Sequence, residues 1–193
     1  MRLYSFSITP NNRKVEAFVR HFYLPVEIHQ VSFKDRETQT PAFLAINPMG
    51  KVPALTDGGL SLWESNAILT YLAGRFPETK ALPTDLAGRA DVDRWLHWQN
   101  CHLAPALVGM QTAEGKPVTQ LATVCSVLDA RLGDQEFLLG SLSVADFALG
   151  SYFLTKSARH HDLSPYPRIR AWIGRVEELR GFVQTRPRQA RTS

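Results

Sequence analysis

Three short segments lie at points where a helix is about to begin or an extended strand opens. Two of them carry hydroxyl, amide or carboxylate side chains, and the third offers backbone N–H and C=O groups. The first is the turn Thr9-Pro10-Asn11-Asn12, which follows an alternating apolar segment and precedes an amphipathic one. The first N–H groups of a helix lack partners within it, and the helix dipole favours an anion there. The hydroxyl and amide groups of this turn could therefore stabilise a bound thiolate. A plain Thr/Asn turn with a helix cap explains the same residues.

The second segment is Glu64-Ser65-Asn66, at the junction between a predicted strand and a predicted helix. Ser65 could cap that helix and also donate to a carboxylate, while Glu64 could accept hydrogen bonds from an ammonium group. Together the two side chains suit the head group of an α-amino acid. Simple capping by Ser65 is an equally good interpretation of the segment by itself.

The third segment, Val52-Pro53, opens a predicted strand, where a proline costs no ladder hydrogen bond. If the peptide bond is cis, the N–H and C=O groups of Val52 point outward as a free edge that could bind an extended peptide by strand addition. A trans proline in an edge strand is the alternative.

The elements that would position these segments alternate between strand and helix in the first part of the chain. Apolar patterns predict strands at 2–6, 26–31, 52–56 and 60–62, and helices from 10 onward, over 41–46 and over 65–76. After Pro77 the spacing predicts helices alone, at about 85–108, 118–132, 143–159 and 166–180. The predicted fold class is an α/β domain of βαβαββα order over 1–77, a linker over 78–87, and an all-α domain over 88–193.

Charge and hydropathy exclude several classes of protein. Residues 1–179 hold 18 basic and 18 acidic side chains, so the net charge of +4 belongs to Arg180, Arg186, Arg188 and Arg191 in a basic C-terminal tail. A neutral body with a basic end indicates a solvated, partly disordered tail rather than a nucleic-acid-binding face. No apolar run approaches the roughly 18 residues that cross a membrane. The first residues lack the apolar stretch of a secretory signal, so we expect a cytoplasmic protein.

The cysteines and histidines do not have the spacing of a disulfide framework or a metal site. Cys101 and Cys125 lie far apart in helical segments and outside any C-x-x-C motif, so we expect two buried free thiols. No residue is predicted to bind a metal.

Taken together, the three segments resemble the glutathione S-transferase family, cytosolic type. The strings N-P-x-x-x-V-P-x-L at 47–55 and W-E-S-x-A-I at 63–68 are specific to it, and the likeness spans about residues 2–155. The resemblance implies a thioredoxin-like glutathione-binding domain over 1–77. Glutathione is then a co-substrate, and no tightly bound cofactor is expected.

The resemblance assigns glutathione contacts to six residues: Gln39, Lys51, Val52, Pro53, Glu64 and Ser65. The backbone of Val52, beside a cis proline, would bind the cysteinyl part. Glu64 and Ser65 would hold the γ-glutamyl ammonium and carboxylate. Lys51, and more weakly Gln39, would bind the glycine carboxylate.

The thiol site departs from the commonest classes of the family. Tyr4 comes too early for a catalytic tyrosine, and Thr9 stands where serine-type members carry serine. The Thr-Pro-Asn string is similar to the bacterial nu class and its Asn-containing relatives, which implies that Thr9 and Asn11 are catalytic. The activated thiolate would attack an electrophilic carbon, or a disulfide or peroxide. Trp98 and His102 could line the pocket of this hydrophobic or disulfide co-substrate, although core packing explains both.

The resemblance implies a homodimer with a role in detoxification, without nucleic-acid or membrane partners. A second hypothesis is a non-catalytic glutathione-binding or protein-interaction module of the same fold. The pattern Ser143-x-x-Asp146 resembles the family's buried capping box, so we expect a structural role for Asp146.

Overall fold

The computed structural model describes residues 1–6, 9–111, 115–117 and 119–187. Close contacts divide the chain into two compact units, Met1–Tyr71 with Leu179–Ser193, and Leu72–Glu178. These units differ from the ranges expected from the sequence, because the C-terminal segment groups with the first unit. The division into domains over 1–77 and 88–193 stays a prediction.

The first unit is built on a four-stranded mixed sheet. Its strands are β1 (Arg2–Ser5), β2 (Glu27–Gln30), β3 (Ala54–Asp57) and β4 (Leu60–Trp63), in the order β2-β1-β3-β4. Strand β1 is parallel to β2 and antiparallel to β3, and β3 is antiparallel to β4. Between the strands lie α1 (Pro10–His21), the short helix η1 (Glu37–Gln39) and α2 (Pro41–Ile46), and α3 (Ser65–Arg75) follows β4. The predicted βαβαββα order is confirmed.

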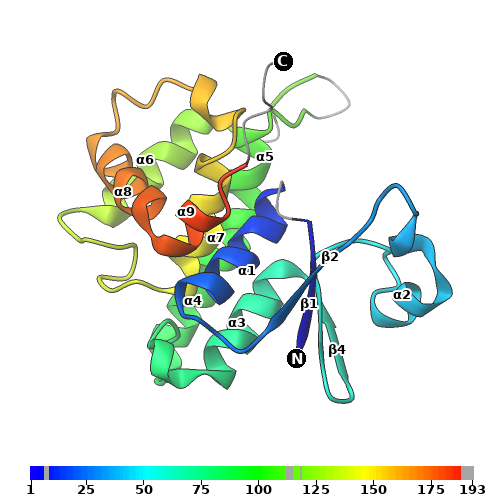
Figure 1. Cartoon of the computed structure of the whole chain (residues 1–193). Coiled ribbons are helices and arrows are strands. Elements are labelled where there is room, and N and C mark those ends of the chain that lie inside the picture. The colour runs from blue at the N-terminus through cyan, green and yellow to red at the C-terminus, as the bar shows by residue number, and fades with distance from the viewer. Residues whose placement is uncertain (7–8, 112–114, 118, 188–193) are drawn as a thin grey trace. The chain divides into compact units, whose positions relative to one another are not determined.

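Alternation along the strands separates the two faces of this sheet. Leu3 of β1 lies opposite Leu55 of β3, and both are fully buried. The next pair along, Tyr4 and Ala54, points to the other face. There Ala54 packs with Phe43 of α2. Helices α1 and α3 therefore cover one face and α2 the other (Figure 1).

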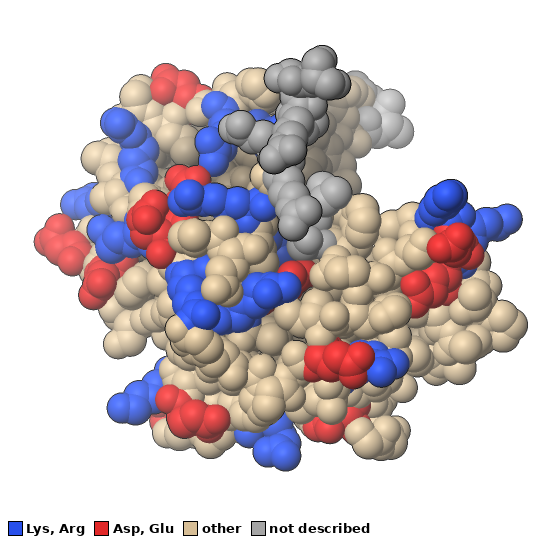
Figure 2. Space-filling view, in the orientation of Figure 1, with Lys and Arg blue, Asp and Glu red and all other residues tan. Residues whose placement is uncertain are grey.

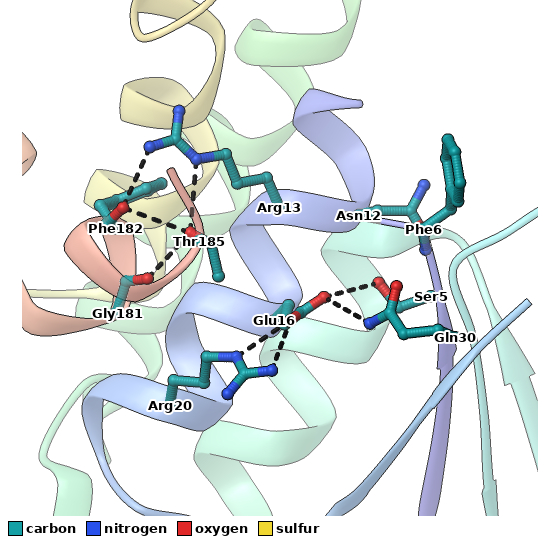
Figure 3. A network of polar contacts seen from close by, with 10 residues as sticks. All are labelled: Ser5, Phe6, Asn12, Arg13, Glu16, Arg20, Gln30, Gly181, Phe182 and Thr185. Carbon is teal, nitrogen blue, oxygen red and sulfur yellow. Dashed lines mark hydrogen bonds and ion pairs between the residues drawn. The ribbon is translucent and has the colours of Figure 1, made fainter. Parts of the chain in front are cut away.

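Helix α1 is anchored to the C-terminal helix α9 (Arg180–Gln184) by a buried arginine (Figure 3). Arg13 donates from Nε to Thr185 Oγ1 at 3.3 Å and from Nη2 to the Phe182 carbonyl at 3.1 Å. Its guanidinium also lies over the Phe182 ring. Gly181 lets the backbones of the two helices approach closely at Ala17.

On the sheet side, α1 is held by the buried carboxylate of Glu16 (Figure 3). It accepts hydrogen bonds from Ser5 Oγ and Gln30 Nε2, each at 3.2 Å, and from Arg20 Nε at 2.9 Å. Each of these donors satisfies part of a carboxylate that would otherwise be costly to bury. Helix α1 is thus fixed on both sides, which sets the position of its first turn.

The regular elements of the second unit are helices, as predicted, and in the residues that the structure describes the loops between them form isolated β-bridges. It contains η2 (Pro77–Thr79), α4 (Leu86–Trp98), the π-helical turn η3 (Gln99–Leu103), α5 (Ala104–Leu107), α6 (Leu121–Leu132), α7 (Val144–Phe153), η4 (Ala158–His160) and α8 (Pro167–Glu178). Two helices differ from the expected spans. The helix over 85–108 widens into η3 just before Pro105, whose missing N–H prevents a regular helical hydrogen bond.

The helix expected over 143–159 ends at Phe153 because a threonine side chain takes over its hydrogen bonds. Thr155 Oγ1 donates to the Tyr152 carbonyl at 2.8 Å and accepts from Ala158 N at 3.2 Å. Such local side-chain bonds compete with the helical pattern.

Two expectations about individual residues are wrong. Cys101 is exposed, whereas Cys125 is buried as expected and burial raises its pKa to about 11. The basic end of the chain is not a solvated tail from residue 180 onward, because Arg180 belongs to α9 and stacks 3.4 Å above the Tyr23 ring centroid. Arg188 and Arg191 lie outside the described residues.

Basic and acidic side chains are interspersed on the surface of the described residues. On the face drawn in Figure 2, lysine and arginine side chains lie among aspartate and glutamate side chains rather than in one continuous patch. Across residues 1–6, 9–111, 115–117 and 119–187, no helix is long and apolar enough to cross a membrane. The same residues form no cluster of three potential metal ligands.

Candidate active site

The turn at Thr9 and the Val52-Pro53 segment are joined by one buried side chain, Asn12. Its exposed fraction is 1%, and its Oδ1 accepts from the Phe6 N–H at 3.2 Å. Its Nδ2 donates to Thr9 Oγ1 at 2.6 Å and to the Val52 carbonyl at 3.3 Å. Asn12 was grouped with the turn from the sequence but given no role, because its partner Val52 is distant in the chain.

The peptide bond between Val52 and Pro53 is cis, as the resemblance predicted. The carbonyl of Val52 is not entirely an open edge, since it accepts the hydrogen bond from Asn12. A carbonyl oxygen can accept two hydrogen bonds, so a second one remains for an extended ligand.

The loop before Val52 is shaped by Asn47 and by a required glycine. Asn47 donates from Nδ2 to the Lys51 carbonyl at 2.6 Å and accepts from Met49 N at 3.0 Å. Gly50 has φ = 60°, and a Cβ there would lie 2.7 Å from Gln39 Nε2. A left-handed, crowded position of this kind favours glycine.

The two residues expected to bind the glycine carboxylate lie on this loop and beside it. Lys51 and Gln39 are both exposed. Gln39 Nε2 donates to the Gly50 carbonyl at 3.3 Å, which places its amide next to the residue that precedes Lys51 along the chain. Both residues therefore lie at the same loop, and their role in binding the glycine carboxylate stays a prediction.

The turn at Asn11 meets the head-group segment through a direct side-chain contact. Ser65 Oγ donates to Asn11 Oδ1 at 3.3 Å, and Ser65 is buried. This bond orients the Asn11 amide with its oxygen toward Ser65, which leaves the NH₂ group on the other side of the amide. Glu64 is exposed and has φ = 69°, so the chain turns sharply from β4 into α3 at this residue.

A buried lysine lies beneath the same segment and was not assigned from the sequence. Lys14 is fully buried, and its Nζ donates to Asn66 Oδ1 at 2.6 Å. Burial lowers the pKa of Lys14 to about 7, and the Glu64 carboxylate offsets part of that effect. The signal available in the sequence was its place beside Val15 and before Phe18, on the helix expected to pack against the sheet.

Trp98 and His102 belong to the helical unit, at the end of α4 and in η3. Their ring centroids are 6.3 Å apart, with His102 exposed and Trp98 partly buried. Trp98 also lines a cavity of about 230 Å³ with Arg94, Trp95, Val127 and Arg131. Their role toward a second substrate stays a prediction.

The sheet order, the cis proline and the helical second unit define a thioredoxin-like domain joined to a helical domain. Residues 1–74 match the family model described as the glutathione S-transferase N-terminal domain. Mouse glutathione S-transferase theta-1 is 31% identical over 205 residues, covering 94% of this chain and 84% of the mouse protein.

Two solved structures extend the comparison. A possible glutathione S-transferase from Rhodopseudomonas palustris is 30% identical, with a TM-score of 0.79 over 97% of this chain and 98% of its own. A glutathione transferase from Burkholderia graminis, solved with two glutathione molecules bound per subunit, is 27% identical, with a TM-score of 0.80 over 98% of this chain and 89% of its own. The chain therefore belongs to the glutathione S-transferase family of enzymes.

Proposed function

We propose that the first unit binds glutathione and ionises its thiol with hydrogen bonds from Thr9 and Asn11. The observation that carries the proposal is the polar connection between the three segments. Thr9 is joined through Asn12 to the Val52 carbonyl, and Asn11 is joined to Ser65. A γ-glutamyl group at Glu64 and Ser65 and a cysteinyl group at Val52 would leave the sulfur at the turn between them. The glutathione bound in the Burkholderia graminis structure supports this choice of ligand.

The geometry at Thr9 suits donation to sulfur. Its hydroxyl oxygen accepts the 2.6 Å bond from Asn12, so its own proton points elsewhere. Asn11 presents its NH₂ group away from Ser65. Both residues lie at the start of α1, where the helix dipole adds to the attraction for a negative charge.

The free energy required is within reach of these interactions. A free thiol with a pKa of about 8.5 is only a few per cent ionised at neutral pH. Lowering that pKa by about two units requires roughly 2.7 kcal/mol. Hydrogen bonds to charged groups contribute about 1.5–3 kcal/mol each.

The thiolate would then act as a nucleophile toward one of two kinds of partner. With an electrophilic carbon, a carbon–sulfur bond forms and the leaving group departs with its electron pair. With a disulfide, the thiolate attacks one sulfur and the other leaves as a thiolate. With a peroxide, the thiolate attacks one oxygen, the O–O bond breaks as an alkoxide or hydroxide leaves, and the sulfur is oxidised to a sulfenic acid. Lys51 and Gln39 would bind the glycine carboxylate. Trp98 and His102 would contact the second substrate.

The family membership supports three further parts of the proposal. We propose a homodimeric state, a cytoplasmic location and a role in detoxification, as membership of the glutathione S-transferase family implies. Light scattering of the purified protein tests the first of these, since a mass of 21.7 kDa would identify a monomer.

Alanine substitution of the thiol donors provides the main test. For Asn11→Ala and for Thr9→Ala we expect kcat for conjugation to fall about 10- to 100-fold, because each removes a hydrogen bond to the charged sulfur. The ultraviolet band of bound glutathione thiolate, followed across pH, should shift toward the pKa of the free thiol. Binding of glutathione should change much less.

Thr84→Ala is the matched control, because Thr84 is an exposed threonine in the other unit. Thr9→Ser should keep most of the rate. Variants at Thr9 and Asn11 with normal rates and a normal thiolate band would disprove the assignment. Saturable binding by the unmodified protein without any shift in the thiol pKa would instead support the non-catalytic module.

A further inference from the structure

The side chain of Asn12 is a buried amide whose orientation is set by two backbone groups. Its Oδ1 accepts from the Phe6 N–H at 3.2 Å, and its Nδ2 donates to the Val52 carbonyl at 3.3 Å. A backbone N–H can only donate and a carbonyl can only accept, so turning the amide over would lose both hydrogen bonds. With an exposed fraction of 1%, the side chain has little access to water that could replace them. The NH₂ group is therefore held on the side of Val52.

This fixed amide determines the role of the Thr9 hydroxyl. One proton of the NH₂ group goes to the Val52 carbonyl, and the other goes to Thr9 Oγ1 at 2.6 Å. The hydroxyl oxygen is thus an acceptor toward Asn12, and its own proton has to point away from the amide. Thr9 is exposed, so this proton is accessible to a ligand at the start of α1.

We propose that Asn12 is a positioning residue, which holds the Thr9 hydroxyl in the orientation that donates its proton to the sulfur of glutathione. The inference rests on the proposed function and deepens it, because it concerns the same thiol site. Asn12 acts through Thr9 and does not itself bind the sulfur. An unrestrained hydroxyl would rotate among water molecules, whereas a donor oriented before the charge develops costs no reorganisation when the thiolate forms.

The same amide connects the thiol donor to the segment that would hold the cysteinyl group. Because one NH₂ group bonds to both, the positions of Thr9 Oγ1 and the Val52 carbonyl are fixed relative to each other. A cysteinyl group anchored at Val52 would therefore bring its sulfur to a hydroxyl in a defined place. Loss of the Asn12 amide should accordingly affect ionisation of the thiol more than affinity for the ligand.

Replacing Asn12 by aspartate reverses the decisive hydrogen bond with little change in shape. A carboxylate can still accept from the Phe6 N–H, but it has no proton to donate and would accept the proton of the Thr9 hydroxyl instead. For Asn12→Asp we expect kcat for conjugation with an activated aryl halide to fall about 10- to 100-fold. The pKa of the bound glutathione thiol, measured from the ultraviolet thiolate band, should rise by about 1 or more. Binding of S-methylglutathione, whose sulfur cannot ionise, should change less than about threefold.

A neutral variant separates the direction of the hydrogen bond from the charge of the new aspartate, which would itself disfavour a thiolate. Asn12→Ala should lower kcat by about 3- to 10-fold, a smaller effect because water can enter the space and donate to the hydroxyl. In a Thr9→Ala background the same substitution should change kcat and the ionisation of the thiol less than about twofold, since no hydroxyl is left to orient. A merely structural role would give the same loss in both backgrounds.

The outcomes distinguish this inference from the proposal beneath it. Asn100→Asp makes the same chemical change at an exposed asparagine of the other unit, and should leave the thiol pKa unchanged. If Asn12→Asp has a normal kcat and a normal thiol pKa, the role of Asn12 is disproved while the glutathione site stands. Equal losses from Asn12→Ala with and without the Thr9 hydroxyl disprove it as well. If the unmodified protein binds glutathione without lowering its thiol pKa, the proposed function fails and this inference fails with it.

A measurement on the unmodified chain tests the inference even where the variants at position 12 fail to fold. In nuclear magnetic resonance spectra of the labelled protein, the side-chain NH₂ of Asn12 should exchange slowly with solvent, because both protons are bonded and buried. With glutathione bound, the proton directed at Thr9 should shift with pH at the pKa of the thiol. An Asn12 amide that exchanges as fast as that of Asn100, or that does not respond to ionisation of the thiol, would overturn the assignment.

Discussion

Replacing Asp146 by alanine is expected to lower the free energy of unfolding by about 4 kcal/mol or more. The side chain is fully buried, and it accepts four hydrogen bonds of 2.9 Å, from Ser143 N, Ser143 Oγ, Leu138 N and Trp172 Nε1. Alanine would leave each of these donors without its acceptor, and each buried donor without a partner costs about 1–3 kcal/mol. Burial raises the pKa of Asp146, and the four donors oppose that effect by stabilising the carboxylate.

Urea unfolding followed by tryptophan fluorescence and by circular dichroism measures this loss. Asp146→Asn should fall between the alanine variant and the unmodified protein, because an amide can accept on one side but presents NH₂ to the donors on the other. Asp93→Ala, at an exposed aspartate of the same helical unit, serves as the control and should change stability little. An Asp146→Ala protein within about 0.5 kcal/mol of the unmodified one would contradict the structural role.

The fold of the first unit could be predicted because its signals are local. Apolar alternation in β1, the Thr-Pro-Asn turn and the helical spacing of Val15 and Phe18 all act within a few residues of one another. The same holds for the loop at 47–53, whose shape depends on Asn47 and a glycine that tolerates a left-handed backbone.

The contacts of Asn12 and Lys14 could not be predicted in the same way. Asn12 meets the Val52 carbonyl across 40 positions of sequence, and Lys14 meets Asn66 across 52. A polar residue on a helix is ordinarily expected to face solvent, and only the folded sheet shows that both side chains face inward. Helical period indicates which residues share a face, but it does not show which face is covered, and so the exposure of Cys101 was missed.

The contact between α1 and α9 was beyond sequence reasoning for a further reason. The basic residues after 179 suggested a solvated end, whereas the structure gives this segment a helix that binds α1. The close approach of α9 to α1 depends on Gly181. A glycine needed for close packing cannot be distinguished in sequence from one needed for a turn. From the sequence, Arg13 would likewise be expected at the surface, whereas in the structure it donates to Thr185 and to the Phe182 carbonyl.

Substituting Gly181 by alanine is therefore expected to disrupt the docking of α9. A Cβ at this position would lie 1.8 Å from the Ala17 carbonyl oxygen and 2.6 Å from its carbon, and these backbone atoms cannot move aside independently. Helix α9 would have to withdraw, which would lengthen the bonds from Arg13 to Thr185 and Phe182. Because overpacking typically costs 1–3 kcal/mol, we expect a loss of about 3 kcal/mol in the free energy of unfolding.

Gly174→Ala in α8 is the informative control, because a Cβ there meets no atom within 4 Å. That substitution should raise stability by up to about 1 kcal/mol, since alanine favours a helix over glycine. Opposite signs for the same chemical change would assign the loss at Gly181 to the contact with Ala17 alone. If Gly181→Ala unfolds at the same urea concentration as the unmodified protein, α9 does not pack on α1 in solution as the structure shows.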